Sequence, residues 1–381
     1  MTKLPFNIPT LVGREIEYMT KAIENSHISG NGEFTALCQS FLEGQLGRGR
    51  ALLTHSCTGA LEMAAILAEI GPGDEVIMPS WTFSSTANAF VLRGAIPVFV
   101  DVRSDTLNID ETLIEAAITP RTKAICVVHY AGVGAEMPTI MAVAKRRGLK
   151  VIEDAAQGLF ANRHGRPLGT VGEFSAFSFH ESKNIIAGEG GALIVNDRAT
   201  FPRAEIIWEK GTNRAQFKRA EVAKYSWVDL GSSFLPSEIL AAFLYAQLEQ
   251  GEAITRRRLK LWRYYFEGFA HLEAKGLVSR PVIPRDCEHN GHIFYLLLTN
   301  AERRDEVLRR LNERGINAII HYVPLHSALA GVRFGRTAGP MSVTEDVAAR
   351  LIRLPLHPQL THEQEDHVVA EIERVLALAA A

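Results

Sequence analysis

Lys183 lies between two apolar segments that read as β-strands, residues 174–180 and 192–195. The glycines of Gly188-Glu-Gly-Gly191 indicate a tight turn between them. Burial at such a turn lowers the pKa of a lysine amine, which frees it to act as a nucleophile or to form a Schiff base. The alternative interpretation is a solvated loop lysine, and this segment alone does not decide between the two.

Asp154 ends the strand-like segment Lys150-Val-Ile-Glu-Asp154, and Gln157 follows three residues later. A carboxylate at the carboxyl end of a parallel strand points into the crevice where such folds bind ligands. There it can keep a pyridine nitrogen protonated, which an electron-sink cofactor requires, and Gln157 can reach the same ring. The alternatives are a helix N-cap for Asp154 and a capping-box partner for Gln157.

Small polar residues suited to phosphate lie between a predicted strand and a predicted helix, in His55-Ser-Cys-Thr-Gly-Ala60. Free backbone N–H groups at a helix N-terminus bind phosphate, and Ser178 offers a hydroxyl for the same group. The segment is not a Walker loop, because it lacks the glycine and lysine spacing of that motif. Phe83 or Trp81 can stack on a flat ring, with ordinary core packing as the alternative for both.

Together these residues supply an imine-forming amine, an acid for a pyridinium, a phosphate cradle and a stacking ring. All of them lie in or beside predicted strands of one domain. They are the parts that pyridoxal 5′-phosphate (PLP) needs, so the sequence predicts a PLP site.

The elements that position these residues alternate between apolar strands and amphipathic helices. Such alternation predicts an α/β fold with a mostly parallel sheet covered on both faces. The expected strands are residues 51–54, 75–79, 97–101, 123–129 and 150–154, and the expected helices between them are 59–68, 85–92, 109–117 and 137–147.

After Asn196 the pattern changes and predicts a second, smaller α/β domain. It begins with one long helix over residues 237–274, with a possible kink near Gly251. The stretch from Ala330 to Pro340 contains glycine and proline and is expected to be a mobile loop. The remaining elements are strands at 293–298 and 318–321 and helices at 304–314 and 362–380.

Composition excludes several classes of function. The 381 residues carry 41 Lys plus Arg against 43 Asp plus Glu, so no net basic field attracts nucleic acid or a membrane surface. The basic clusters at 256–258 and 303–304 are expected to be solvated helix faces. Four dispersed cysteines without a CxxC motif, and an N-terminus without a signal-peptide pattern, predict a cytoplasmic protein. No metal site is expected, because His357, His362 and His367 lack ligand spacing and are interpreted as surface residues.

Ordered motifs along nearly the whole chain resemble the DegT/DnrJ/EryC1/StrS sugar aminotransferases. The resemblance implies a PLP-dependent transferase of fold type I, aspartate aminotransferase-like, with a mostly parallel seven-stranded type of sheet. It also implies a large PLP-binding domain with an N-terminal arm over residues 1–248 and a small C-terminal domain over 249–381. The motifs are Ser29-Gly-Asn-Gly32, Pro72-Gly-Asp-Glu-Val-Ile-Met-Pro79, Thr82-Phe-Ser-Ser-Thr-Ala-Asn88, Gly94-Ala-Ile-Pro-Val-Phe-Val-Asp101, Glu153-Asp-Ala-Ala-Gln157, Ser178-Phe-His-Glu-Ser-Lys183 and Gly188-Glu-Gly-Gly191.

Carried over to this chain, the resemblance implies a role for each site residue. Lys183 is the Schiff-base lysine and the base that moves the proton, Asp154 pairs with the pyridine nitrogen, and Gln157 contacts the side of the phenolic oxygen. The remaining cofactor contacts are Cys57, Thr58 and Ser178 at the phosphate and Phe83 on the ring.

A finer resemblance is to the family members that make dTDP-4-amino-4,6-dideoxygalactose, of the enterobacterial-common-antigen type. It implies transfer of the amino group of L-glutamate to C4 of dTDP-4-keto-6-deoxy-D-glucose, through the pyridoxamine form of the cofactor, for cell-surface polysaccharide. Lys210, Arg214, His321 and Tyr322 are the expected substrate contacts. Solvated or interface positions are the alternatives for these four residues.

Two departures from the family pattern involve substrate and subunit contacts. Ser233 takes the place of an asparagine that a neighbouring subunit normally adds at the phosphate, and Lys210-Gly211 replaces the usual His-Gly. The shared site implies at least a homodimer. Another nucleotide-linked keto sugar, including a C3-keto sugar, remains an alternative acceptor. A sugar dehydratase is disfavoured by Lys183 itself, and a non-catalytic PLP-binding regulator by the complete cofactor set.

Overall fold

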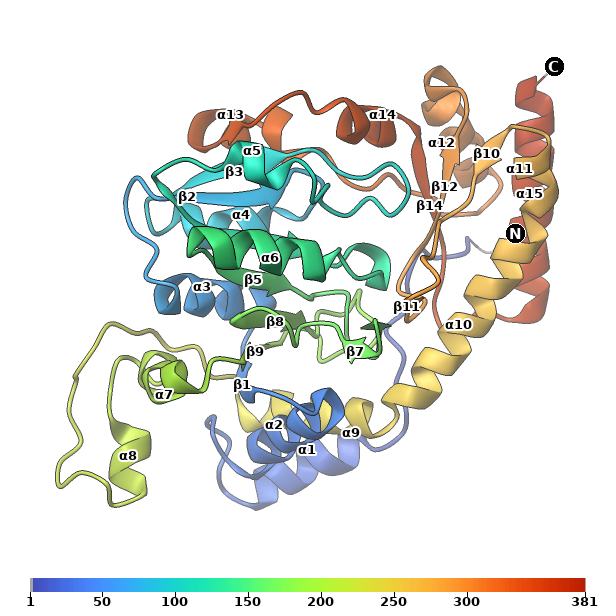
Figure 1. The fold of residues 1–381 in the computed structure, drawn as a ribbon. Coiled ribbons are helices and arrows are strands. Elements are labelled where there is room, and N and C mark those ends of the chain that lie inside the picture. Colours follow the sequence, from blue (N-terminus) through green and yellow to red (C-terminus); the bar gives the residue numbers. More distant parts are fainter. Residues whose placement is uncertain (1–2, 381) are drawn as a thin grey trace.

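The computed structural model describes residues 3–380. A central eight-stranded sheet organises the molecule (Figure 1). Every neighbouring pair is parallel except the two made by β9. This confirms the expected α/β class, with one strand more than the seven foreseen. In spatial order the strands are β1 (Arg50–Thr54), β9 (Gly191–Val195), β8 (Phe174–Ser178), β5 (Lys150–Asp154), β4 (Thr122–Val128), β2 (Glu75–Pro79), β3 (Ile96–Val100) and β13 (Arg336–Thr337).

Helices cover both faces of this sheet, which explains why its strands are apolar along their whole length. One face packs against α3 (Cys57–Leu67), α4 (Ser84–Val91) and α7 (Phe201–Trp208). The opposite face is covered by two groups of helices: α5 (Ile114–Ala117) and α6 (Met137–Arg147) near β3 and β4, and α1 (Glu15–Glu24), α2 (Glu33–Leu46) and α9 (Glu238–Glu249) near β1 and β9.

The C-terminal part has its own antiparallel sheet and its own hydrophobic core. The N-terminal segment joins this core, since Leu4 pairs with Ile316. A separate core is what a second domain requires, while the boundary after residue 248 stays a prediction. The strands are β10 (Val278–Ser279), β12 (Phe294–Leu298) and β14 (Leu351–Leu354), and the helices around them are α10 (Gly251–Gly268), α11 (Ala270–Ala274), α12 (Arg304–Glu313), α14 (Ser342–Arg350) and α15 (His362–Ala380).

The single long helix expected over residues 237–274 is wrong, because the chain forms three consecutive helices there. α9 ends at Glu249. Its C-cap Gln250, with φ of −102° and ψ of 7°, leaves the helical region, and α10 begins at Gly251. A Cβ at Gly251 would lie 2.2 Å from the ring of Phe160, so this turn of backbone is pressed against the segment between β5 and β6 (Asn162–Arg163). The break allows α9 to pack with α1 and α2 while α10 crosses to the C-terminal core (Figure 1).

Two further expectations in the C-terminal part are also wrong. Residues 330–340 are not an open loop: they contain the end of α13 (Leu329–Phe334) and then β13, which adds to the edge of the large sheet. Residues 318–321 form no strand, and only Ile319 makes an isolated bridge, to Arg353 of β14. Short pairings of this kind depend on a distant partner, so the local sequence pattern does not reveal them.

Two residues expected at the surface are buried. Arg258 is 2% exposed, and its guanidinium donates hydrogen bonds to the carbonyl oxygens of Gly291 and His292 at 3.1 and 2.6 Å. His357 is 1% exposed. Both face the junction between α10 and the segments around β12 and β14.

No helix among residues 3–380 combines the length and hydropathy needed to cross a bilayer.

Candidate active site

A pocket of about 530 Å³ opens where the carboxyl ends of the central parallel strands meet the C-terminal part. Val128, Asp154 and Ser178, which end β4, β5 and β8, all line it. The opposite wall comes from the C-terminal part and from the N-terminal segment, as Phe6, His292, His321, Tyr322 and Arg353. The site thus lies in the crevice expected for an open α/β sheet.

Lys183 reaches this pocket from the turn that follows β8. Its backbone N–H donates to the carbonyl oxygen of His180 at 2.9 Å, which closes the turn. The residue as a whole is half-buried and lines the pocket. Burial of the amine lowers the pKa of Lys183, the nearby charge of Arg353 lowers it further, and Cys57 and Asp154 act in the opposite direction. The amine is therefore more easily freed of its proton than that of an ordinary surface lysine.

Asp154 is held by hydrogen bonds that leave its carboxylate facing the pocket. Asp154 is only 5% exposed, and Thr86 Oγ1 donates a hydrogen bond to its Oδ2 at 2.7 Å. Thr82 Oγ1 lies 2.7 Å from Thr86 Oγ1, so the two hydroxyls form a chain that ends on the carboxylate. Ala156 N–H donates to Oδ1 at 3.1 Å, and no helix begins there, so Asp154 is not a helix N-cap.

Gln157 joins the two walls of the pocket. Its Oε1 accepts from the backbone N–H of Ala131 at 2.7 Å, and its Nε2 donates to Tyr322 Oη at 3.1 Å. These bonds assign the direction of the amide and leave no capping-box partner for it. Because Tyr322 belongs to the C-terminal part, this hydrogen bond ties that part to the large sheet.

The N-terminus of α3 forms the polar end of the pocket. Ser56 caps the helix by accepting from Gly59 N–H at 3.0 Å, whereas the N–H groups of Cys57 and Thr58 have no acceptor within the helix. A Cβ at Gly191 would lie 2.4 Å from the backbone nitrogen of Cys57, so glycine is needed where β9 passes this turn. Ser178 lines the same pocket, and the whole is a cradle suited to a phosphate.

Of the two candidate stacking rings, only one lines the pocket. Phe83 is 61% exposed and lies at its rim, whereas Trp81 is fully buried. The Trp81 ring packs edge-on against Tyr130 and Tyr322, with centroids 6.0 and 5.7 Å away. Trp81 is thus a core residue behind the wall.

His321 and Tyr322 also line the pocket, as part of an aromatic cluster with Tyr130. Tyr130 Oη lies 3.0 Å from His321 Nδ1. Burial lowers the pKa of His321 well below its usual range, and the charges of Arg353 and Lys183 lower it further. The imidazole is therefore neutral at pH 7.

The structure does not bring Lys210, Arg214 and Ser233 into the pocket of the same chain. They belong to residues 209–233, a segment that includes α8 (Arg214–Lys218) and extends away from the sheet (Figure 1). We call this segment the projecting arm. Its two ends are pressed together, since Ser233 bridges Glu209 and a Cβ at Gly211 would lie 1.9 Å from Asp229 O. The roles of these three residues stay predictions.

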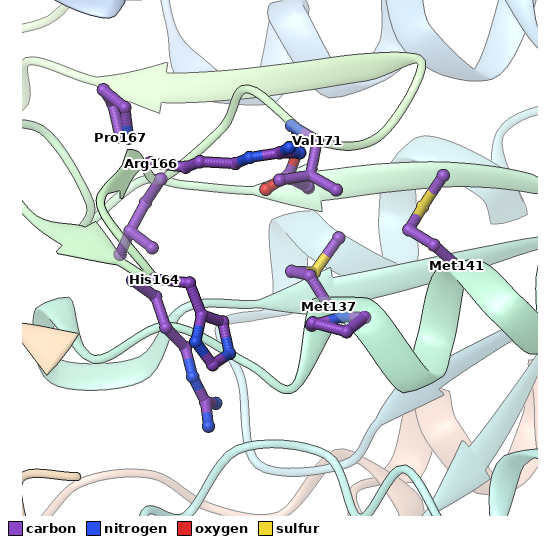
Figure 2. A pocket seen from close by; sticks show the side chains of 10 residues that line it. Met137, Met141, His164, Arg166, Pro167 and Val171 are labelled. Carbon is purple, nitrogen blue, oxygen red and sulfur yellow. Dashed lines mark hydrogen bonds between the residues drawn. The ribbon is translucent and has the colours of Figure 1, made fainter. Parts of the chain in front are cut away.

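A second cavity, of about 600 Å³, shows that size alone does not mark the active site. Figure 2 shows Met137 and Met141 of α6 facing Arg166 and Pro167, which form β7, and His164 of the turn between β6 and β7. None of its lining residues lines the pocket of Lys183. Its walls are mostly apolar and lack a nucleophile paired with an acid.

Beside this cavity, Glu136, His164 and Asp286 bring three potential metal-ligand atoms within 4.8 Å of one another. This group could not be anticipated from the sequence, because its members come from distant segments. Arg163 already pairs with both carboxylates, and its Nε lies 3.0 Å from Asp286. The guanidinium thus already offsets part of the negative charge of the two acids, and we propose no metal site there.

The residues of the first pocket fit PLP. The cradle at α3 matches a phosphate, Asp154 matches a pyridine nitrogen, and the amine of Lys183 matches the aldehyde. These groups come from the ends of different strands but line one cavity. Bound there, PLP supplies an electron sink for the negative charge that develops when a proton leaves the carbon next to an amine.

Comparisons with known proteins agree with this reading of the site. The model of the DegT/DnrJ/EryC1/StrS aminotransferase family matches residues 9–373. The spore coat polysaccharide biosynthesis protein SpsC of Bacillus subtilis is 31% identical over 382 residues, which cover 98% of this chain and 97% of that protein.

Solved structures agree as well. The aminotransferase TlmJ of Streptoalloteichus hindustanus superposes with a TM-score of 0.91 at 28% identity, covering 99% of this chain and 100% of that one. The PLP form of the sugar aminotransferase Spr1654 of Streptococcus pneumoniae superposes with a TM-score of 0.89 at 25% identity, covering 99% of both chains.

The chain belongs to the DegT/DnrJ/EryC1/StrS aminotransferase family. It is therefore a PLP-dependent enzyme of the sugar aminotransferase class, with the fold of type I PLP enzymes.

Two residues that matter for the pocket were not anticipated. Arg353 is the one charged residue of the strand Leu351-Ile-Arg-Leu354, and a lone charge in a buried strand is a signal that the sequence does contain. Thr86 could not be singled out, because a threonine in the first turn of a helix is commonly a capping residue, and only the fold shows its distant partner.

Proposed function

We propose that this enzyme transfers the amino group of L-glutamate to C4 of dTDP-4-keto-6-deoxy-D-glucose. The product would be dTDP-4-amino-4,6-dideoxy-D-galactose, a precursor of cell-surface polysaccharide. The observation that carries the class of reaction is the buried amine of Lys183 in one pocket with Asp154 and the phosphate cradle. The particular sugar rests on the resemblance of segments such as residues 128–132, 209–214 and 321–326 to the enzymes that make this product.

Within this reaction, Lys183 Nζ removes the proton from the α-carbon of the donor and later delivers one to C4 of the sugar. Its lowered pKa makes the neutral amine more readily available as a base than that of a solvated lysine. Asp154, whose carboxylate accepts hydrogen bonds from Thr86 and Ala156, would pair with the pyridine nitrogen. The amine then moves from donor to acceptor in two half-reactions that use the same residues in opposite directions.

The acceptor is recognised by residues from two sides. His321 and Tyr322 line the pocket and face the sugar. Lys210, Arg214 and Ser233 on the projecting arm reach the site of a neighbouring subunit in a homodimer, where the two basic residues approach the diphosphate and Ser233 the cofactor phosphate. The arm exposes apolar side chains that an interface would cover, among them Phe217, Tyr225, Trp227, Val228 and Leu230.

The test is an incubation of the purified enzyme with PLP, L-glutamate and dTDP-4-keto-6-deoxyglucose. Mass spectrometry measures conversion of the keto group to an amine, and NMR gives the configuration at C4. An axial amine at C4 supports the proposal, and an equatorial amine assigns the gluco-configured product instead. Sedimentation of wild-type enzyme against an Arg214→Ala, Trp227→Ala variant tests the shared site.

A second acceptor class is separated by the same experiment. If glutamate converts the cofactor to its pyridoxamine form but the 4-keto sugar is not aminated, the acceptor is another nucleotide-linked keto sugar, with a C3-keto sugar tested next. If glutamate produces no change at all in the cofactor, glutamate is not the amino donor and the proposed function is wrong.

A further inference from the structure

His292 carries a ring nitrogen that the chemistry described so far does not use. The residue is only 5% exposed, lines the same pocket as Lys183 and comes two residues before β12 in the C-terminal part. Its Nδ1 lies 2.9 Å from Asn184 Oδ1, whereas its Nε2 has no hydrogen-bond partner within residues 3–380 and is not enclosed by protein. Buried polar groups nearly always have a partner, so the pocket must supply one for Nε2.

The hydrogen bonds of Asn184 determine which ring nitrogen of His292 carries the proton. Asn184 Nδ2 donates to the carbonyl oxygen of Asn290 at 3.0 Å, and this orientation turns Asn184 Oδ1 toward the imidazole. An amide oxygen only accepts, so His292 Nδ1 must be the donor. Burial lowers the pKa of His292 well below its usual range, and the charges of Lys183, Arg258 and Arg353 lower it further. The ring is therefore neutral, and its Nε2 is a hydrogen-bond acceptor.

The turn that carries His292 is fixed against the large sheet. Asn290 Nδ2 donates to the carbonyl oxygens of Gln157 and Leu159, both at 2.8 Å, and Asn290 Oδ1 accepts from the backbone N–H of His292 at 3.1 Å. On the other side, the guanidinium of Arg258 donates to the carbonyl oxygen of His292 at 2.6 Å. The acceptor Nε2 is therefore held in one position although it belongs to the C-terminal part.

Among the cations around this acceptor, Lys183 is the one free to donate to it. After burial, the charge of Lys183 is the largest cause of the low pKa of His292, so the two groups are close. Lys183 also directly precedes Asn184, which holds the ring. Arg258 already donates to two carbonyl oxygens, and the guanidinium carbon of Arg353 lies 4.7 Å from the centre of the Phe6 ring.

We propose that His292 Nε2 accepts a hydrogen bond from the amine of Lys183 and so orients this amine for proton transfer. An amine that donates one N–H to a fixed acceptor has its lone pair turned away from that acceptor. His292 acts through Lys183 and is therefore a positioning residue. The assignment deepens the proposed function, in which Lys183 carries the proton, and rests on it. The bond forms whenever the amine is free, including in the cofactor-free chain.

Two substitutions separate the two nitrogens of the ring. His292→Asn keeps a donor at the place of Nδ1 and removes the acceptor at Nε2. His292→Gln places an amide oxygen near the position of Nε2 and gives up the bond to Asn184. Together they distinguish the hydrogen bond to Lys183 from the packing of the turn.

The first readout is the pKa of the Lys183 amine in the cofactor-free chain. Acetylation by acetic anhydride is followed at several pH values by mass spectrometry of the peptide that contains Lys183. A neutral acceptor stabilises the charged amine, so its loss in His292→Asn should lower this pKa by about one unit, while His292→Gln stays near wild type. Lys145, at an exposed position of α6, is labelled in the same samples and should not change.

The second readout is the half-reaction with L-glutamate, measured by single-turnover absorbance at saturating glutamate. Loss of the orienting bond in His292→Asn should slow it about tenfold and should move the acid limb of its pH profile to lower pH. His292→Gln should recover most of the rate. The affinity of the cofactor-free chain for PLP should stay unchanged in both variants. His271→Asn, at an exposed position of α11, is the matched control and should behave as wild type.

Asn184→Ala keeps the proposal testable if His292→Asn does not fold. It leaves the ring in place but no longer fixes the proton on Nδ1, so it should lower the pKa of Lys183 in the same direction by a smaller amount. Equal effects of His292→Asn and His292→Gln would mean that His292 only supports its turn, and an unchanged Lys183 pKa in all three variants would mean that the bond is absent. Either result overturns the assignment. Wild-type enzyme that is inert to glutamate overturns the proposed function instead, since the labelling needs neither cofactor nor substrate.

Discussion

The two walls of the active-site pocket differ in origin and in chemistry. The large sheet contributes Lys183, Asp154 and the N-terminus of α3, all next to strand ends and each held by hydrogen bonds. The C-terminal part contributes His321, Tyr322 and Arg353, from segments with little regular structure around one strand. The first wall carries groups that suit the cofactor. The second carries Arg353, whose Nε has no acceptor, beside the two residues that we propose as sugar contacts.

The difference suggests a division of roles within one pocket: one wall carries the groups for the cofactor chemistry, and the other carries the groups that would select the substrate. Substitutions in the first wall should slow both half-reactions, because both use the same proton carrier and the same cofactor. Apart from those of His292, substitutions in the second wall should act on one substrate at a time. The second cavity is slightly larger than the active-site pocket, yet its lining does not combine groups of these two kinds.

The largest expected effect is that of Lys183→Ala. Removal of the amine eliminates the base that moves the proton, so both half-reactions should slow by about 10⁴-fold. Single-turnover absorbance with L-glutamate, and with the keto sugar added to the pyridoxamine form, measures each half separately. Met141→Ala in the second cavity is the control and should retain wild-type rates. Retention of either half-reaction in Lys183→Ala would contradict the assignment of the first wall.

A smaller loss is expected for Thr86→Val, which removes the hydroxyl that donates to Asp154. A hydrogen bond to a charged group stabilises by about 1.5–3 kcal/mol, so kcat should fall by at least about tenfold in both half-reactions. The affinity for PLP, measured by titrating the cofactor-free chain, should fall with it. Thr86→Ser keeps the hydroxyl and should stay near wild type. A defect in Thr86→Ser as large as that in Thr86→Val would point to packing instead.

Tyr322→Phe is expected to have a modest effect on the other wall. It removes the Tyr322 hydroxyl from the wall that we propose contacts the sugar, and a neutral hydrogen bond contributes about 0.5–1.5 kcal/mol. We expect about a fivefold rise in KM for the keto sugar, with the glutamate half-reaction nearly unchanged. Steady-state kinetics with each substrate varied in turn gives the two values. Equal changes for both substrates would remove the distinction between the walls.

The last prediction concerns the stability of the cofactor-free chain. The pKa of Lys183 is lowered in the folded state, whereas the unfolded lysine keeps its proton up to about pH 10.4. Between these two pKa values the unfolded chain binds more protons, so the free energy of unfolding rises with pH across that window. Lys183→Met removes this proton site. It should be more stable than wild type below the window and should show a shallower rise with pH.

Urea titrations at several pH values measure this slope, and Lys145→Met, at an exposed position of α6, is the control. Equal slopes for Lys183→Met and wild type would show that the amine of Lys183 is solvated in the cofactor-free chain.

Most of the first wall could be predicted from the sequence. Asp154, Ser178 and Lys183 each follow a strand whose apolar pattern is unmistakable, and parallel strands bring their carboxyl ends to one edge. The helices α6 and α15 were also predicted, because their patterns are long and periodic.

The second wall could not be predicted to the same extent. His321 and Tyr322 entered only through the resemblance to a family, and the strand expected around them is absent. Arg353 was not anticipated, although a single charge within Leu351-Ile-Arg-Leu354 was visible. The burial of Arg258 and His357 likewise depends on how α10 packs against segments that are distant in the sequence.

The sequence by itself determined the α/β class, the strands of the large sheet and the groups that suit PLP, because apolar periodicity and turn residues act over a few residues. Only the tertiary structure decided which charges lack partners, which ring faces the pocket, and that residues 209–233 extend away from their own site. Those properties depend on contacts between distant segments. An unpaired Arg353 and a paired Asp154 look the same until the fold shows what surrounds each of them.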